Sequence, residues 1–129
     1  MRLLFAALTL AAFAAPSVAR DSMRIPEATP VGPPKSCIPL TQIRETHVRD
    51  DRTIDFMLGG KTVYRNTLPF ACPSLGFEER FSYATSLSQL CSTDTITVLY
   101  ASPTLSRGAT CGLGQFQPVT LATSRKAHK

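Results

Sequence analysis

The stretch TIDFMLGGKTVYRNTLP, residues 53–69, has the pattern of a β-hairpin and indicates the fold class. Apolar and other residues alternate on both sides of Gly59-Gly60, a dipeptide that tolerates the positive φ angles of a tight turn. Pro69 ends the returning strand because proline cannot donate to a strand ladder. One face of the hairpin is expected to carry Ile54, Phe56, Leu58, Tyr64, Asn66 and Leu68. The other face is expected to carry Thr53, Asp55, Met57, Val63, Arg65 and Thr67.

Further strands are expected on both sides of this hairpin. Upstream, residues 43–49 form a weaker strand that reaches the hairpin through the polar turn Asp50-Asp51-Arg52. Downstream, residues 80–84, 95–100 and 115–121 have strand character, the second of them rich in β-branched and aromatic side chains. We expect residues 101–110 to form a loop. Ser86 and Gln89 have capping-box spacing and predict a helical turn just before Leu90.

The fold is therefore predicted to be all-β, with about five or six short strands in a small, strongly twisted antiparallel sheet that curls into a barrel or sandwich. At most one short helix is expected outside the leader. The predicted core consists of Ile43, Val48, Ile54, Phe56, Leu58, Tyr64, Leu68, Leu75, Phe81, Tyr83, Leu90, Ile96, Val98, Leu113 and Phe116.

The first residues have the layout of a secretory signal peptide. Met1-Arg2 is a short positive start, residues 3–15 are almost uniformly apolar, and Ser17-Val18-Ala19 is a small-x-small cleavage site. We therefore expect residues 1–19 to be removed and the mature chain to lie in the periplasm or outside the cell, without a transmembrane segment. Residues 20–36 are predicted to be a proline-rich flexible linker, 37–121 the folded β domain, and 122–129 a disordered basic tail.

Four cysteines in an exported chain of 129 residues predict two disulfides. No two of them form a C-x-x-C pair, which argues against a thioredoxin-type redox motif and paired zinc ligands. Three connectivities are open. We prefer Cys72–Cys91 with Cys37–Cys111, because the second bond would join the two ends of the domain.

The surroundings of these cysteines resemble a known group of proteins. The motifs are Cys72-Pro73-Ser74-Leu75, Leu90-Cys91-Ser92-Thr93-Asp94 and the run CGLGQFQP at 111–118. The set is similar to a family of small exported proteins of Gram-negative bacteria that is known as a domain of unknown function, over about residues 37–119. The resemblance implies export and a compact domain, and it carries no catalytic residue.

The formal net charge of +5 invites a nucleic-acid interpretation, but the charges are unevenly placed. Within 37–121 basic and acidic residues are equally frequent, and the surplus lies in the two flanking segments. The basic residues there are Arg44, Arg49, Arg52, Lys61, Arg65, Arg80 and Arg107. The acidic ones are Glu45, Asp50, Asp51, Asp55, Glu78, Glu79 and Asp94. Since a nucleic-acid reader needs a basic face on its folded body, we expect no nucleic-acid partner.

The chain offers weak candidates for chemistry. His47 lies near Asp50 and Asp51, yet no G-x-S-x-G motif supplies a nucleophile. His128 lies in the tail. Asp55 and Glu79 are a conceivable glycosidase pair, although acidic doublets such as Glu78-Glu79 are usually solvated surface. We predict no catalytic, cofactor-binding or metal-binding residue.

The four arginines Arg44, Arg49, Arg52 and Arg65 fall on or beside neighbouring strands. They suggest either a patch for an anionic partner or cross-strand pairing with the acids between them, and we favour pairing.

The leading functional hypothesis is a non-enzymatic binding or accessory module of the bacterial envelope. Its recognition surface would be a sheet edge or the Ala101–Thr110 loop, and its partner an envelope protein. The alternative is a small secreted inhibitor or effector. A hydrolase that uses His47 is the third hypothesis.

Overall fold

The predicted hairpin lies at the centre of the structure, a computed structural model that describes residues 25–85 and 87–122. Strands β4 (Thr53–Leu58) and β5 (Val63–Thr67) pair antiparallel, with Phe56 opposite Tyr64 and Asp55 opposite Arg65. The turn is one residue longer than the glycine pair: a 3₁₀ segment, Gly59–Lys61, closes with the Leu58 N–H donating to the Thr62 carbonyl at 2.8 Å. Gly60 and Lys61 both have positive φ there.

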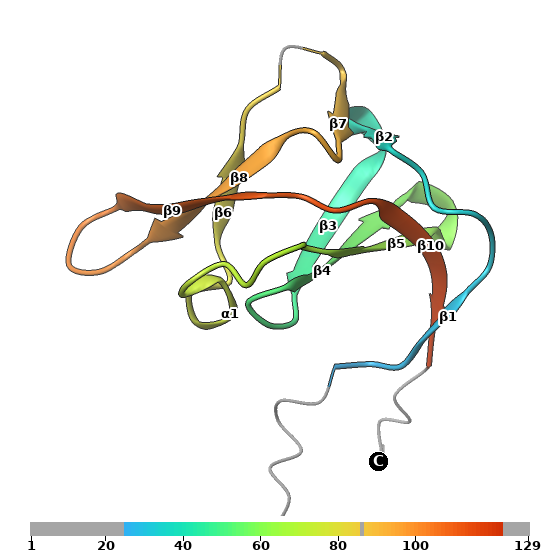
Figure 1. Cartoon of the computed structure of the whole chain (residues 1–129), viewed down its shortest axis with the longest axis horizontal. Coiled ribbons are helices and arrows are strands. Elements are labelled where there is room, and N and C mark those ends of the chain that lie inside the picture. Colours follow the sequence, from blue (N-terminus) through green and yellow to red (C-terminus); the bar gives the residue numbers. More distant parts are fainter. Residues whose placement is uncertain (1–24, 86, 123–129) are drawn as a thin grey trace, which may run out of the picture.

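The hairpin belongs to a five-stranded antiparallel sheet with the order β1-β10-β5-β4-β3 (Figure 1). Strand β3 (Ile43–Val48) pairs with β4, as the sequence predicts. Strand β10 (Phe116–Leu121) pairs with β5 on the other side and is itself covered at its outer edge by β1 (Ala28–Pro30).

Two smaller antiparallel sheets complete the fold. One pairs β2 (Cys37–Pro39) with β7 (Gln89–Cys91), and the other has the order β6-β8-β9. Its strands are β6 (Phe81–Tyr83), β8 (Thr95–Tyr100) and β9 (Ser106–Gly112). Helix α1 (Leu75–Glu78) is a single turn, and a 3₁₀ turn spans Leu40–Gln42. Within the described residues, no helix is long and apolar enough to cross a membrane.

The all-β class is confirmed, but two boundaries differ from expectation. The expected linker is part of the fold from β1 onwards: Ala28–Pro30 pairs with β10, and the Lys35 N–H donates to the Phe116 carbonyl at 2.8 Å. Prolines there are accommodated because β1 is an edge strand. The expected loop 101–110 is shorter, since residues from Ser106 onwards form β9 against the strongly β-forming β8.

The helical turn expected around residues 86–91 is wrong where it can be tested. Gln89–Cys91 is strand β7, paired with β2 in a register that places Cys37 opposite Cys91. Ser86, the proposed cap, lies outside the described residues. A short segment next to a disulfide pairs with the strand that the disulfide brings beside it, and this long-range constraint outweighs a weak local capping signal.

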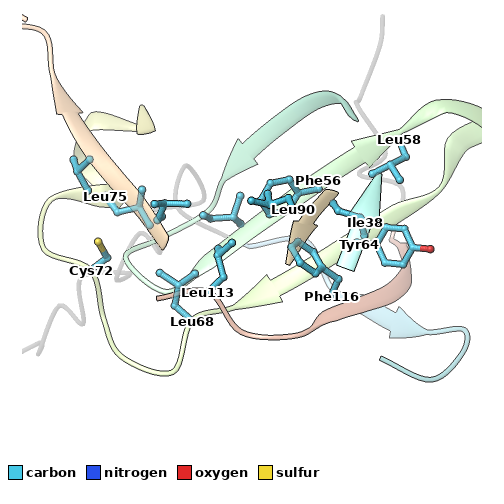
Figure 2. Packing of buried hydrophobic residues seen from close by; sticks show 13 residues of the cluster. Ile38, Phe56, Leu58, Tyr64, Leu68, Cys72, Leu75, Leu90, Leu113 and Phe116 are labelled. Carbon is cyan, nitrogen blue, oxygen red and sulfur yellow. The ribbon is translucent and has the colours of Figure 1, made fainter. Parts of the chain in front are cut away.

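The core lies between the five-stranded sheet and the two smaller ones. Figure 2 shows its labelled side chains in one row, from Tyr64 and Leu58 through Phe56 and Phe116 to Cys72 and Leu75. The rings of Phe56 and Phe116 meet edge to face, with centroids 5.4 Å apart. The predicted core residues that are buried are Ile54, Phe56, Leu58, Tyr64, Leu68, Leu75, Leu90, Ile96, Val98, Leu113 and Phe116.

The other core predictions fall short by different amounts. Ile43, Val48 and Phe81 pack against the core while partly exposed, and Tyr83 is 37% exposed because it is the last residue of the short β6. Three buried hydrophobic residues of the described chain were not predicted: Ile38, Cys72 and Val119. Ile38 was missed because no strand was predicted for residues 37–39, which form β2.

The preferred disulfide pairing is wrong. The structure joins Cys37 to Cys91 and Cys72 to Cys111, with Cα–Cα distances of 4.0 and 5.8 Å. The reason lies in the sheets: β2 and β7 place Cys37 directly opposite Cys91, and Cys111 on β9 faces the segment that contains Cys72. The bonds close loops with sequence separations of 54 and 39. In the chain-entropy picture each therefore destabilises the unfolded state by about 4 kcal/mol.

The two disulfides should be reduced in order. Cys37 and Cys91 are both partly exposed, whereas the second bond pairs the partly exposed Cys111 with the fully buried Cys72, so a small phosphine reaches the Cys37–Cys91 bond first. Timed reduction under native conditions, followed by alkylation and mass spectrometry, should show labelled Cys37 and Cys91 before labelled Cys72 and Cys111. Simultaneous appearance of all four labels would contradict the protection that the buried Cys72 gives the second bond.

A buried amide ties the turn before β10 to the hairpin. Asn66, fully buried on β5, donates from Nδ2 to the Gly114 carbonyl at 2.7 Å and accepts from the Gly114 N–H at 2.8 Å. This pair of hydrogen bonds imitates a backbone pair and requires close approach: a Cβ at Gly114 would lie 2.2 Å from the Thr67 carbonyl oxygen. Gly112, two residues away, has nothing within 4 Å of the same position.

Gly114→Ala should therefore destabilise the fold by about 1–3 kcal/mol, because the new methyl forces the β9–β10 turn away from β5 and strains the Asn66 hydrogen bonds. Gly112→Ala is the matched control and should change the free energy of unfolding by less than about 0.5 kcal/mol. Urea denaturation of the two variants beside the wild type measures both. Equal effects would mean that the close approach at Gly114 is not a constraint.

Candidate functional site

Two of the four arginines on or beside the strands, Arg49 and Arg65, pair with one carboxylate, that of Asp55. Asp55 is fully buried, and Arg65 donates to it from Nε and Nη2 at 2.7 and 2.9 Å. Arg49 adds a third bond from Nε at 2.9 Å. Arg65 also donates to the Pro26 carbonyl at 2.9 Å, so the cluster holds the N-terminal segment against the sheet. Cross-strand pairing is thus confirmed for Arg49 and Arg65, with Asp55 directly opposite Arg65. Arg52 instead donates to the Leu68 carbonyl, and no ion pair of Arg44 occurs among the described residues.

The pairing changes the acidity of Asp55. Burial alone would raise the pKa of this carboxyl group, but the hydrogen bonds from Arg65 and Arg49 and their positive charges outweigh burial and lower it below the ordinary 3.8. The same contact with Asp55 raises the pKa of Arg65. The carboxylate is consequently a structural anion. It is fully buried and does not line the cleft that Glu79 lines, so the two carboxylates do not flank an open cleft as a glycosidase pair would.

Stability should depend on the charge of Asp55. Its pKa is lower in the folded state, so the stabilisation is present at neutral pH and is lost as the pH falls from about 4 through the folded-state pKa. Asp55→Asn should destabilise the protein by about 3–5 kcal/mol at pH 7, because it leaves the guanidinium groups without their counter-charge, and should flatten the acid limb of the stability curve. Thermal melts from pH 7 to pH 2 measure this.

Glu45→Gln is the control for Asp55→Asn. Glu45 lies on the neighbouring strand β3, and its carboxylate is exposed in a contact with His47. That variant should keep both the neutral-pH stability and the acid limb. An unchanged acid limb in Asp55→Asn would contradict the role given to the cluster.

His47 does not line either surface hollow of the described residues. His47 lies exposed on the edge strand β3, and its Nε2 is 2.9 Å from Glu45 Oε2. Its hydrogen-bond partner among the described residues is thus an acid and not a serine. His128 lies outside the described residues. The hydrolase hypothesis stays a prediction with no nucleophile assigned to it.

The acidic doublets accept hydrogen bonds from neighbouring backbone N–H groups or line a surface cleft. Asp51 accepts from the Gly76 N–H through Oδ1 at 2.7 Å, and Asp50 accepts from the Arg52 N–H at 2.8 Å. Glu79, at the end of α1, lines a surface cleft. Within the described residues, no group of three or more histidine, cysteine or acidic side chains has a metal-binding arrangement.

The feature that sequence reasoning missed is a segment we call the aromatic loop, residues 69–79, which includes α1. Phe70 is 82% exposed and Phe77 is 87% exposed, the two highest values among the exposed large hydrophobic side chains of the described chain. Single exposed apolar side chains are common on protein surfaces, whereas two almost fully exposed rings on one short loop form the kind of patch that marks an interaction site. The sequence contained one sign of this exposure: Phe70 lies between Pro69 and Pro73, and these prolines prevent a strand that would bury its side chain.

The aromatic loop is held firmly by its neighbours (Figure 1). Cys72 bonds to Cys111 of β9, and its N–H donates to the Asp51 carbonyl at 2.7 Å. Arg52 donates from Nε to the Leu68 carbonyl at 3.0 Å just before the loop. Gly76 packs so tightly on the β3–β4 turn that a Cβ there would lie 3.0 Å from Asp51 Oδ1. The two phenylalanines are therefore presented from a rigid support.

Two surface hollows flank the aromatic loop. A cleft of about 780 Å³ lies between the loop and the β3–β4 turn, and Phe77 stands on its rim together with Ile25, Arg49 and Glu79. A smaller hollow of about 280 Å³ lies between the loop and β9, lined by Phe70, Ala71, Thr110, Cys111 and Gly112. Ala71 lines both hollows, so they lie on either side of the aromatic loop and are next to each other.

Comparison of the chain with models of protein families, with curated proteins and with solved structures found no match. The candidate site consequently stands on its own geometry.

Proposed function

We propose that this chain is a non-enzymatic, exported binding module of the bacterial envelope, and that the aromatic loop is its recognition surface. The observation that carries the proposal is the exposure of Phe70 and Phe77 on a covalently braced loop between two hollows. Rigid aromatic side chains beside concave surface are the usual anchors of protein interfaces, because they bury much area with little loss of conformational entropy.

Burial of the two phenylalanine side chains against a partner is favourable relative to their exposure to solvent. Burying one phenylalanine side chain contributes roughly 1.5–3 kcal/mol. The loop loses little freedom on binding, since the Cys72–Cys111 bond and the Asp51 hydrogen bonds already order it. A preordered apolar surface of this kind converts more of its buried area into affinity than a mobile one.

Export is supported by two independent features. Both pairs of cysteines are joined in disulfides, a state that persists in oxidising compartments. The first nineteen residues have the order of charge, apolar run and small residues that directs secretion. An envelope protein is therefore the class of partner that the module meets.

One observation favours the alternative, a secreted inhibitor or effector. The β8–β9 connection, residues 101–105, extends from the body in Figure 1, and Leu105 within it is 73% exposed. An inhibitor would insert such a projecting loop into the active site of its target. The aromatic loop carries two exposed rings and adjoins both hollows, so it is the better-supported surface.

Capture experiments separate the two surfaces. Phe70→Ser and Phe77→Ser should each weaken capture of the envelope partner at least about tenfold, because each removes one buried ring. Leu105→Ser tests the projecting loop, and Leu87→Ser, at a side chain 66% exposed elsewhere on the surface, is the matched control. All four replace exposed apolar groups and should leave the melting temperature unchanged. The measurement is quantitative pull-down from an envelope extract.

The proposal is contradicted if capture survives both phenylalanine changes. Loss of capture in Leu105→Ser alone would favour the inhibitor alternative. Absence of any partner above background with the wild-type protein would remove the binding function itself.

A further inference from the structure

We infer that the module binds its partner by adding an extended segment of that partner to the free edge of β9, with one apolar side chain of the segment in the hollow beside Phe70. This inference rests on the proposed function and names the form of the ligand. Strand addition supplies affinity through backbone hydrogen bonds and specificity through pockets for individual side chains.

The hydrogen-bond pattern shows which groups of β9 face outward. The Leu99 N–H donates to the Arg80 carbonyl at 3.0 Å, so Leu99, and by alternation Thr97, directs its backbone groups towards β6. Thr110 is the register partner of Thr97, and Arg107 is the partner of Leu99. Arg107 and Thr110 consequently direct their own N–H and C=O groups away from β8, towards the free edge.

Gly112 extends this row. The Leu113 N–H donates to the Asp94 carbonyl at 3.2 Å, so the backbone groups of Leu113 face the β8 side. Because the direction alternates along a strand, the backbone groups of Gly112 face away from β8. Strand β9 is last in its sheet, and among the described residues no other segment makes a backbone hydrogen bond to these three outward residues. At seven residues it is also the longest strand of the described chain.

The edges of the two larger sheets are protected differently. On β3, the four exposed residues include Arg44 and Glu45, and charged side chains of this kind discourage the addition of another strand. On β9, Arg107 is also charged and exposed, and the register with β8 shifts between Arg107 and Thr110, which places a bulge at Gly108 and Ala109. Since charges and bulges both discourage strand addition, the open part of the edge is its uncharged end at Thr110 and Gly112, next to the hollow.

The hollow next to β9 sets the character of the partner. It lies at the Gly112 end of the edge, where Phe70, Ala71 and Cys111 form apolar walls, and Arg107 lies towards the other end. A segment added antiparallel would place an apolar side chain in the hollow and a neutral or acidic one beside Arg107. The partner is thus an extended polypeptide with an apolar residue several positions before an acidic one.

A second copy of the chain is the less suitable occupant. If two β9 strands overlapped fully in antiparallel register about Ala109, residues 106–108 of one copy would face the hollow of the other. These residues are Ser106, Arg107 and Gly108, none of which has an apolar side chain to fill it. Self-association in full overlap therefore leaves the hollow empty, and a register shifted to bring the exposed Leu105 to the hollow pairs fewer residues of β9. A foreign segment with leucine or phenylalanine at this position fills the hollow without that loss.

The test uses the oxidised protein and the blocked peptide Ac-Leu-Thr-Val-Thr-Val-Thr-Glu-NH₂ as probe. Amide NMR spectra should show saturable shifts at Arg107, Thr110 and Gly112. Serine in place of the peptide leucine should weaken binding about tenfold or more, because the hollow loses its apolar occupant. Proline in place of the valine at position 3 should abolish binding, because it removes a backbone donor.

Two protein variants complete the test. Thr110→Pro removes an outward N–H and should abolish peptide binding, while Thr110→Lys keeps the N–H, folds as an exposed substitution and should weaken binding several-fold. Thr46→Lys places the same charge at an exposed threonine of β3 and should have no effect. Shifts confined to β1 or β3, or a dimer that Thr110→Lys dissociates, would overturn the inference.

The two proposals fail separately. Phe77→Ser changes a residue that does not line the β9 hollow, so it should lose envelope capture through the cleft and keep peptide binding. If the Thr110 variants retain full envelope capture and the peptide produces no shifts at β9, strand addition is wrong while the binding function stands. If the wild-type protein captures no envelope partner, the binding function is wrong whatever the peptide does.

Discussion

The Cys72–Cys111 disulfide is the constraint on which the candidate surface depends. It joins the aromatic loop to β9 through a sulfur atom that is fully buried on the Cys72 side. Without this bond, the loop would be attached to the body only by non-covalent contacts, among them the hydrogen bonds to Asp51, those from Arg52 to the Leu68 and Pro69 carbonyls, and the packing of Leu75 and Gly76. The bond also fixes the distance between Phe70 and the edge of β9, and that distance creates the smaller hollow. One covalent link therefore both stabilises the fold and shapes its surface.

One cluster of ion pairs likewise serves two purposes in the body of the protein. The carboxylate of Asp55 receives three hydrogen bonds from two arginines on the outer face of the central hairpin, and one of these arginines anchors the N-terminal segment at Pro26. Positive charge that would otherwise form an anion-binding patch is thereby used inside the structure. This arrangement gives a physical reason for expecting a partner that is recognised by apolar contacts and backbone hydrogen bonds.

Local patterns predicted the central elements well, and long-range pairing decided the rest. The hairpin and β8 were predicted because their alternation and β-branched residues act within a few positions. Strands β2 and β7 have three residues each and are defined by facing one another across a disulfide, which no local pattern reveals. Strand β9 is rich in glycine and small residues, so it was read as a loop, although the register with β8 makes it an edge strand.

The candidate site was harder to predict than the fold for the same reason. Exposed phenylalanines are indistinguishable in sequence from core phenylalanines such as Phe56, and only the turn residues around Phe70 distinguish them. The sheet edge was anticipated as a class of recognition surface, whereas the identity of the edge required the register of β8 with β9. The wrong choice among the three disulfide pairings also hid the link between Cys72 and β9, and with it the position of the aromatic loop.

The central claim is that this particular pair of disulfides exists in the working protein. Peptide mapping under non-reducing conditions, applied to protein recovered from its natural compartment with thiols blocked at lysis, tests it most directly. The account predicts linked peptides that contain Cys37 with Cys91 and Cys72 with Cys111, and no alkylated cysteine. Free thiols, or a peptide that joins Cys72 to Cys91, would contradict it.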